Sequence, residues 1–286
     1  MRPEGEMLEL ILRFAQEDDA IRAVTMNGSR ANEECVSDEY SDYDIQYLVR
    51  DIRPYVRDKA WIGHFGDVLI LQEPDDWFSH PYDMDGQENY AFLIQFQDGN
   101  RIDITFVNVS NLERLNAEEE PRRLLLSKDT SLRVRETLHA GAFLVKRPTK
   151  EEFDDTVNEF LWLSLYVLKG IHRQELSYAK AFLDKYEIDL LYTMVSWKIG
   201  CARRFTVSAG KAYKNLKRYL PDGEAERLGR VYSDGSFPRI YDSLLIAIDL
   251  FEEYAVQVAD ALGFPLDRKQ IESIKKYVRD RRPANA

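Results

Sequence analysis

The stretch between Gly28 and Asp44 constrains the possible folds of this chain more than any other. Gly28-Ser29-Arg30 directly follows residues 21–26, whose apolar and partly β-branched side chains predict a strand. Glycine tolerates any φ and lets a ligand approach the backbone closely. A strand, a Gly-Ser turn and a helix start together expose N–H groups that suit a phosphate. We therefore predict a phosphate-binding turn, with Ser29 capping a short helix to about residue 34.

The second half of this stretch opens another predicted strand, residues 42–49. Side chains alternate along a strand, so Asp42 and Asp44 lie on one face and Ile45 and Tyr47 on the other. The apolar face belongs to the core. We therefore expect the two carboxylates to face a cleft.

A third acidic position lies in a predicted hairpin. Residues 90–96 and 101–107 flank Gln97-Asp98-Gly99-Asn100, which is a strong hairpin signal. Asp103 lies within the β-branched second arm, where an acid is unfavourable unless it has a function. We expect this arm to run antiparallel to the strand at 42–49 and to bring Asp103 beside Asp42 and Asp44.

Three neighbouring carboxylates predict a metal site, because like charges at close range are costly without a cation. Nucleotidyl transfer needs such a site, since two Mg²⁺ ions held by carboxylates neutralise a triphosphate and clamp the attacking and leaving oxygens. Asp-x-Asp and Gly-Ser are each common by chance. The prediction rests on their conjunction with the two strands and the hairpin.

The composition changes to long helical patterns near residues 146–149. We predict helices at about 150–172, 175–186, 188–204, 211–220, 238–262 and 267–281, in addition to 4–18. Capping boxes are expected at Ser110–Glu113 and Thr149–Glu152, and residues 122–147 are ambiguous. The predicted fold is an α/β (α+β) domain at 1–147, with a small mixed sheet that includes a strand at 68–71, followed by an all-α helical bundle at 148–286.

Charge and composition limit the partners and the location. Residues 1–145 carry 15 Lys and Arg against 29 Asp and Glu, whereas residues 146–286 carry 24 against 21. The acidic first half argues against a nucleic-acid partner, although solubility alone also explains it. The sequence shows no apolar run that could span a membrane, no signal-peptide pattern and only two cysteines, so we expect a cytoplasmic protein. We expect a monomer or weak dimer.

The chain resembles the aminoglycoside 6-adenylyltransferases (streptomycin adenylyltransferases) of the nucleotidyltransferase superfamily. The matching stretches are Val24-Thr25-Met26-Asn27-Gly28-Ser29-Arg30, Asp42-Tyr43-Asp44-Ile45, Ile102-Asp103-Ile104-Thr105, Lys146-Arg147-Pro148-Thr149, Glu152-Phe153-Asp154-Asp155, Asn158-Glu159-Phe160, Lys169-Gly170, Gly210-Lys211-Ala212-Tyr213-Lys214 and Lys217-Arg218-Tyr219-Leu220. They span nearly the whole chain, including the helical half that generic nucleotidyltransferases lack. Asn27 departs from the pattern, because an acid is expected before Gly-Ser-Arg.

The resemblance implies transfer of AMP from ATP to an aminoglycoside hydroxyl, the 6-hydroxyl of streptomycin, with release of pyrophosphate. It implies that Asp42 and Asp44 ligate two Mg²⁺ ions. Asp103 would ligate the ion nearer the acceptor and act as general base. Gly28, Ser29 and Arg30 would bind the phosphates of ATP, and both substrates would sit between the two halves.

The helical half supplies the remaining candidates. Lys169, Lys211 and Lys214 would contact the triphosphate, and Lys211, Lys214 and Arg218 share one face of the expected helix; a solvated surface is an equally good interpretation. Asp155 and Glu159 would bind the cationic drug, whereas Glu152 fits helix capping better.

Other side chains have plainer interpretations, and two other functions stay open. Trp162, Tyr166 and Trp197 favour core packing, and the four histidines lack metal-ligand spacing, so no zinc is expected.

One alternative function is that of a nucleotidyltransferase with another acceptor, such as a lincosamide, a protein hydroxyl or an RNA end. The other is a catalytically silent binding module of the same fold.

Overall fold

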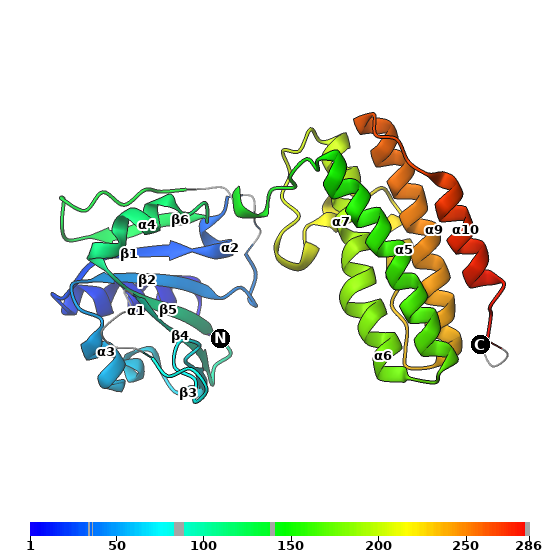
Figure 1. Ribbon diagram of the computed structural model, residues 1–286. Helices are drawn as coiled ribbons and strands as arrows, with labels where there is room; N and C mark the ends of the chain where they lie inside the picture. The colour runs from blue at the N-terminus through cyan, green and yellow to red at the C-terminus, as the bar shows by residue number, and fades with distance from the viewer. Residues whose placement is uncertain (34, 36, 83–88, 138–140, 284–286) are drawn as a thin grey trace. The chain divides into compact units, whose positions relative to one another are not determined.

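The computed structural model describes the chain except residues 34, 36, 83–88, 138–140 and 284–286. The chain forms two compact units, Met1–Ala142 and Phe143–Ala286 (Figure 1). The first contains a six-stranded mixed sheet with helices, and the second is helical. This arrangement confirms the predicted fold class. The functional division into a catalytic part at 1–147 and a binding part at 148–286 stays a prediction.

The strands of the first unit are ordered β3-β4-β5-β2-β1-β6. Their bounds are β1 Ile21–Asn27, β2 Tyr43–Val49, β3 Val68–Gln72, β4 Asn89–Phe96, β5 Arg101–Asn108 and β6 Arg122–Ser127. The antiparallel pair β4–β5 confirms the predicted hairpin. β2 and β5 are parallel, so the expectation that the Asp103 arm runs antiparallel to the Asp42 strand is wrong. The long connection after β2 returns the chain to the same end of the sheet before β3 begins, and this sets the direction of β5.

One face of the sheet packs into the core of the first unit. Tyr43, Ile45 and Tyr47 of β2 are buried on this face, under helix α1 (Glu4–Glu17) and helix α3 (Arg53–Arg57). The Tyr47 hydroxyl donates a hydrogen bond to the backbone oxygen of Ile11 at 3.0 Å, so the polar end of this buried ring is satisfied. The apolar alternation predicted for β2 is therefore confirmed.

The opposite face carries a polar row across three strands. Asn27 pairs with Asp44 across β1 and β2, and Asp44 pairs with Asp103 across β2 and β5. Because directly paired residues project from the same face, these three side chains lie side by side. Helix α4 (Leu112–Ala117) covers the other end of this face through Leu115, which packs against Ala23. The row that contains the acids stays partly exposed.

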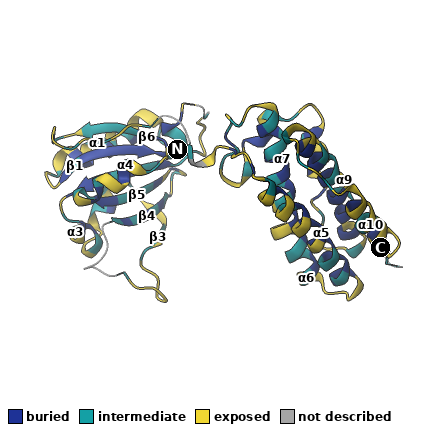
Figure 2. Ribbon diagram, turned by 45° about the horizontal axis from the view of Figure 1, so that its top comes forward, coloured by how far each residue is buried: buried dark blue, intermediate teal, exposed yellow. Residues whose placement is uncertain are grey.

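The second unit is a bundle in which α5, α7, α9 and α10 lie side by side (Figure 1). Its helices are α5 Lys150–His172, α6 Leu176–Ala181, α7 Ile188–Ala202, α8 Glu224–Gly229, α9 Phe237–Leu262 and α10 Arg268–Arg279, and a π-helical turn, Phe182–Glu187, joins α6 to α7. The buried positions of α5 and α9 line the sides where these helices meet (Figure 2). Thr149 and Glu152 exchange the two hydrogen bonds of a capping box, as predicted.

Two local predictions are wrong. The segment 211–220 forms two 3₁₀ turns, Lys211–Tyr213 and Leu216–Tyr219, because Ala212 and Tyr213 adopt positive φ angles of 52° and 62° that break a helix. Tyr213 stacks on Tyr192 with ring centroids 5.4 Å apart, a tertiary contact that favours this path. Ser110 does not cap α4, since Asn111 precedes the helix without a side-chain cap bond.

Glu187 is completely buried at the junction of the π-helical turn and α7. The Ser164 hydroxyl donates to its Oε1 at 2.6 Å, and its Oε2 has no hydrogen-bond partner in the described part of the chain. Burial raises the pKa of this carboxyl to about 8, and the bond from Ser164 opposes the rise. The side chain is therefore protonated at neutral pH in the folded protein.

We predict that Glu187→Gln removes a pH dependence from the stability of the second unit. The unfolded carboxyl ionises near its usual pKa of 4.5, but the folded one stays protonated to about 8, so wild-type stability falls between these values. At pH 8 the variant should be more stable by about 2–4 kcal/mol. Urea unfolding at pH 5 and pH 8 measures this, with exposed Glu272→Gln as control. Parallel pH profiles for variant and wild type would contradict the prediction.

Candidate active site

Three carboxylates converge at one edge of the sheet in the first unit. Asp42 lies just before β2, Asp44 is the second residue of β2, and Asp103 is the third residue of β5. One carboxylate oxygen from each lies within 4.8 Å of the others, and all three side chains are partly exposed. Carboxylate oxygens are the ligands that Mg²⁺ prefers, so this cluster could hold divalent metal. The predicted convergence of the three aspartates is therefore present.

The Asp44 side chain lies so close to position 28 that only glycine fits there. Its φ is +68°, and a Cβ built at this position would lie 1.9 Å from Oδ2 of Asp44. No side chain fits there, because real Cβ atoms stay beyond about 3 Å of such neighbours. The carboxylate of Asp44 therefore packs directly against the backbone of the turn, which begins the short helix α2 (Gly28–Ala31).

Asp44 experiences the strongest electrostatic perturbation in the cluster. Burial, together with the negative charges of Asp42 and Asp103, raises its pKa to about 6, and Arg101 opposes this rise. A cation placed among the three carboxylates would relieve this repulsion. The donor set and its electrostatics thus fit a divalent ion.

Arg101 is a member of the cluster that sequence reasoning missed. Its Nε and Nη2 donate to the two carboxylate oxygens of Asp103 at 2.8 and 2.7 Å, and Nε lies 3.8 Å from Oδ2 of Asp42. The side chain is 44% exposed. The signal was its position two residues before Asp103 on one strand, because residues at i and i+2 project from the same face.

Asn27 adds an uncompensated donor to the same row. Its side chain is 4% exposed, and its Oδ1 accepts from the Thr25 hydroxyl at 3.1 Å. Its Nδ2 has no partner within the described residues. Buried N–H groups are rarely left unpaired, so this amide suits an anionic oxygen such as that of a phosphate. An acid at this position, which the family pattern led us to expect, would offer no such donor.

Arg30 fixes the chain segment that leads into Asp42. Its guanidinium donates to the backbone oxygens of Ser41 at 2.9 Å and Asp42 at 3.1 Å, and lies 4.0 Å from the ring centre of Tyr43. The role of Arg30 in phosphate binding stays a prediction. The predicted cap is wrong, because Asn27 rather than Ser29 precedes α2, which ends at Ala31; residue 34 lies outside the described residues.

The candidates for drug binding lie on an exposed face of α5 in the second unit. Asp155 and Glu159 are exposed, and neither forms an ion pair with another described residue. Glu152 belongs to the capping box, as expected. Trp162 is 54% exposed, so its predicted place in the core is wrong. The spacing of four and three residues puts Asp155, Glu159 and Trp162 in one stripe, and exposed residues of α5 are visible in Figure 2.

Lys169 lies further along α5, above two aromatic rings. Its Nζ is 4.9 Å from the ring centre of Tyr166 and 5.8 Å from that of Tyr178. Tyr166 itself is partly buried, and its ring centre lies 6.2 Å from that of Trp162. Cation–π contacts of this kind hold the ammonium group at the helix end while leaving it partly exposed.

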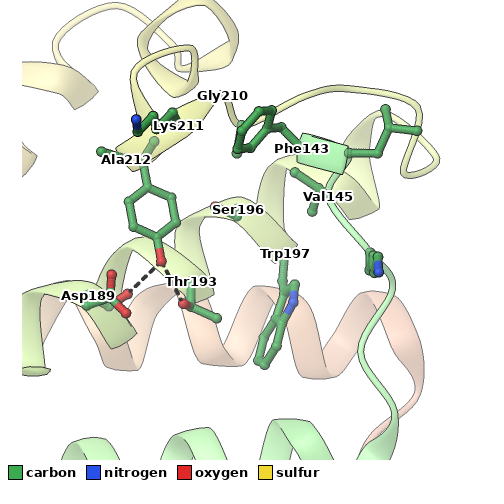
Figure 3. Close-up of a pocket in the computed structure, with 13 residues that line it drawn as sticks. Phe143, Val145, Asp189, Thr193, Ser196, Trp197, Gly210, Lys211 and Ala212 are labelled. Atoms are coloured by element: carbon green, nitrogen blue, oxygen red, sulfur yellow. Dashed lines mark hydrogen bonds between the residues drawn. The ribbon is translucent and has the colours of Figure 1, made fainter. Parts of the chain in front are cut away.

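The predicted phosphate-binding lysines of the loop lie at two neighbouring pockets of the second unit. The larger, of about 420 Å³, lies between one face of α7 and the turn at Lys211 (Figure 3). Its lining comprises Phe143, Leu144, Val145, Lys146, Asp189, Thr193, Ser196, Trp197, Ala209, Gly210, Lys211, Ala212 and Tyr213. Lys214 lines a second pocket of about 290 Å³. Because 211–220 is not one helix, Lys211, Lys214 and Arg218 do not share a helical face.

Full-length matches to known proteins accompany this geometry. A sequence model of the family described as streptomycin adenylyltransferase matches residues 1–281. Aminoglycoside 6-adenylyltransferases are 34% identical in Bacillus subtilis (strain 168), covering 97% of both chains, and 32% identical in Staphylococcus aureus, covering 96% of this chain and 97% of the relative. A crystal structure titled as an aminoglycoside 6-adenyltransferase from Bacillus subtilis aligns at 31% identity with a TM-score of 0.49, covering 98% of this chain and 99% of that one.

These matches show that the protein is a nucleotidyltransferase enzyme, and the carboxylate cluster beside a glycine turn on a mixed sheet agrees with that class. Within that class, the chain belongs to the streptomycin adenylyltransferase family. Among the described residues, no helix combines the length and the apolar character needed to cross a membrane.

We predict that Gly28→Ala disrupts the carboxylate cluster. The new methyl group would displace the Asp44 carboxylate, and the positive φ adds strain, so Mn²⁺ affinity should fall at least about tenfold and stability by about 1–3 kcal/mol. Gly263→Ala is the matched control, because Gly263 has φ +72° with open space around its Cβ position. Calorimetric Mn²⁺ titration and thermal unfolding give the two readouts. Equal Mn²⁺ affinity in both variants would contradict the proposed contact.

We predict that Asp44→Asn stabilises the protein when metal is chelated. The raised pKa means that wild-type stability is lost as pH rises from the unfolded value of 3.8 through about 6. In EDTA at pH 8 the variant should gain about 2 kcal/mol, and this gain should vanish near pH 4. Thermal or urea unfolding at both pH values tests this. A variant that is less stable than wild type at pH 8 would show that the carboxylate is not repelled there.

Proposed function

We propose that this protein transfers AMP from ATP to a hydroxyl of an aminoglycoside, the 6-hydroxyl of streptomycin, and releases pyrophosphate. The observation that carries this proposal is the convergence of Asp42, Asp44 and Asp103. The family described as streptomycin adenylyltransferase and the relatives named as aminoglycoside 6-adenylyltransferases support the donor and the acceptor.

The carboxylates divide the chemistry. Asp42 and Asp44 would hold two Mg²⁺ ions, and Asp103 would hold the one nearer the acceptor. These ions would neutralise the triphosphate and stabilise charge on the attacking and leaving oxygens. Asp103 accepts the proton of the acceptor hydroxyl, whose oxygen attacks the α-phosphorus. The bond from that phosphorus to the bridging oxygen breaks, and pyrophosphate leaves.

The turn of the first unit binds the phosphates of ATP. Gly28 lets them approach the backbone, and the Ser29 hydroxyl binds them. Nδ2 of Asn27, which has no partner among the described residues, donates to an anionic oxygen. Arg30 keeps Asp42 in place through its backbone contacts and adds positive charge beside the turn.

Lysines of the second unit contribute further triphosphate contacts. Lys211 lines the larger pocket and Lys214 the smaller one, and neither forms an ion pair with a described residue. Lys169, held over aromatic rings, is the third. In the larger pocket the aromatic wall of Phe143 and Trp197 suits a nucleobase (Figure 3).

The exposed stripe of α5 binds the aminoglycoside. Such a drug carries several positive charges, and Asp155 and Glu159 offer two carboxylates that no described cation neutralises. Trp162 adds an exposed ring against which a sugar can pack. This stripe extends the predicted substrate site by one residue.

The same proposal limits the partners and the location. The excess of acids in residues 1–145 would repel a polynucleotide, so we propose small-molecule substrates and no nucleic acid. Both cysteines are free, which agrees with a cytoplasmic enzyme. We propose that it acts as a monomer or weak dimer.

The decisive assay is Mg²⁺-dependent release of pyrophosphate from ATP, with and without streptomycin. Release that requires streptomycin is expected, and Asp103→Ala should lower it at least about 1,000-fold with the fold intact by circular dichroism. Release with another acceptor alone would replace streptomycin in the proposal. No release with any acceptor, or full activity in Asp103→Ala, would refute the enzyme mechanism.

Substitutions in the second unit should separate the two substrates. Glu159→Gln and Trp162→Ala are expected to raise the KM for streptomycin about three- to tenfold and leave that for ATP unchanged, whereas Lys211→Ala should do the reverse. Steady-state kinetics at saturating levels of the other substrate test this. Glu151→Gln, an exposed acid in the first turn of α5, is the control. Equal changes in both KM values would indicate a folding effect and contradict the assignment.

A further inference from the structure

Arg101 occupies the position of a cation within the carboxylate cluster. Its guanidinium meets the Asp103 carboxylate in a two-pronged pair, with donor–acceptor distances of 2.8 and 2.7 Å. It also lies 3.8 Å from a carboxylate oxygen of Asp42. The side chain therefore offsets part of the charge that a metal ion would otherwise balance.

The electrostatics link Arg101 to all three aspartates. The guanidinium is paired with Asp103 and lies 3.8 Å from Asp42. Asp44 is the direct cross-strand partner of Asp103, so all three negative charges lie near the one positive charge of Arg101. Arg101 and a divalent ion bound to the same oxygens would repel each other at a distance of a few ångströms.

Arg101 lies at a strand end with a partly exposed side chain. It is the first residue of β5, its side chain is 44% exposed, and a flexible aliphatic stem carries the planar guanidinium. A phosphate offers the same two-pronged acceptor geometry as the Asp103 carboxylate and carries more charge. The nearby turn at Gly28 and the Nδ2 group of Asn27, which has no partner within the described part of the chain, favour a phosphate on this face of the sheet.

We propose that Arg101 is an exchangeable counter-cation, which pairs with Asp103 and Asp42 until the metal–nucleotide complex enters and then transfers to its phosphates. This inference rests on the proposed function, because it takes the carboxylates as metal ligands. A metal ion that binds alone is repelled by the positive charge of Arg101. When metal and nucleotide bind together, the phosphates provide a new partner for the guanidinium. The side chain therefore couples the two ligands and disfavours metal uptake without nucleotide.

The first test measures Mn²⁺ binding without nucleotide, by the paramagnetic resonance signal of free Mn²⁺. Arg101→Gln should bind Mn²⁺ about tenfold more tightly than wild type, because the competing charge is gone. Arg101→Lys, which keeps the charge, should stay near wild type. Arg53→Gln is the matched control, since Arg53 forms a comparable two-pronged pair with exposed Asp51 in the same unit. Unchanged or weaker binding in Arg101→Gln would overturn the proposal.

The second test measures binding of an ATP analogue with a methylene bridge between the α- and β-phosphorus atoms, in the presence of Mg²⁺. Here Arg101→Gln should bind about tenfold more weakly, and Arg101→Lys should recover part of the loss. Unchanged binding in Arg101→Gln would overturn the transfer to phosphate. Asp103→Asn separates the two hypotheses: if it binds Mn²⁺ as wild type does, the proposed metal site itself fails, whatever Arg101 does.

Discussion

The close contact between the Asp44 carboxylate and the Gly28 backbone is the constraint on which the rest of the first unit depends. A carboxylate oxygen lies where any other residue would place its Cβ, so the turn and β2 can approach only through glycine. This approach sets the turn, which we propose to bind phosphate, against the acids. It also buries Asp44 enough to raise its pKa, which makes a bound cation favourable.

Such an arrangement is costly, and the other face of the sheet offsets the cost. Rings and aliphatic side chains from β2, β4 and β5 pack beneath α1 and hold the strands in register. Register is what brings Asn27, Asp44 and Asp103 into one row, because a shift by one residue would turn each of them into the core. The apolar layer thus stabilises a polar layer that would not persist alone, and Arg101 balances part of its charge.

The second unit separates stability from recognition in a similar way. Its helices bury an extensive apolar core that includes Phe160 and Phe251, stacked 3.7 Å apart between ring centres. The outward stripe of α5 carries an exposed tryptophan and carboxylates that form no ion pair with another described residue. At the turn of Lys211, strained backbone contributes to a pocket. Ala212 and Tyr213 have positive φ angles, and both residues line that pocket.

The sequence alone determined the features that depend on local chemistry. Alternation in residues 42–49, the Gly99 hairpin and the Thr149 capping box are encoded within a few residues, so the strands, the first long helix and the acids of the cluster could be predicted. Only the tertiary structure decided the parallel pairing of β2 with β5, the addition of β6, the broken turn at Lys211, the exposure of Trp162 and the contact of Arg101 with Asp103. These features depend on which distant segments become neighbours, and local patterns of polar and apolar residues do not specify those long-range contacts.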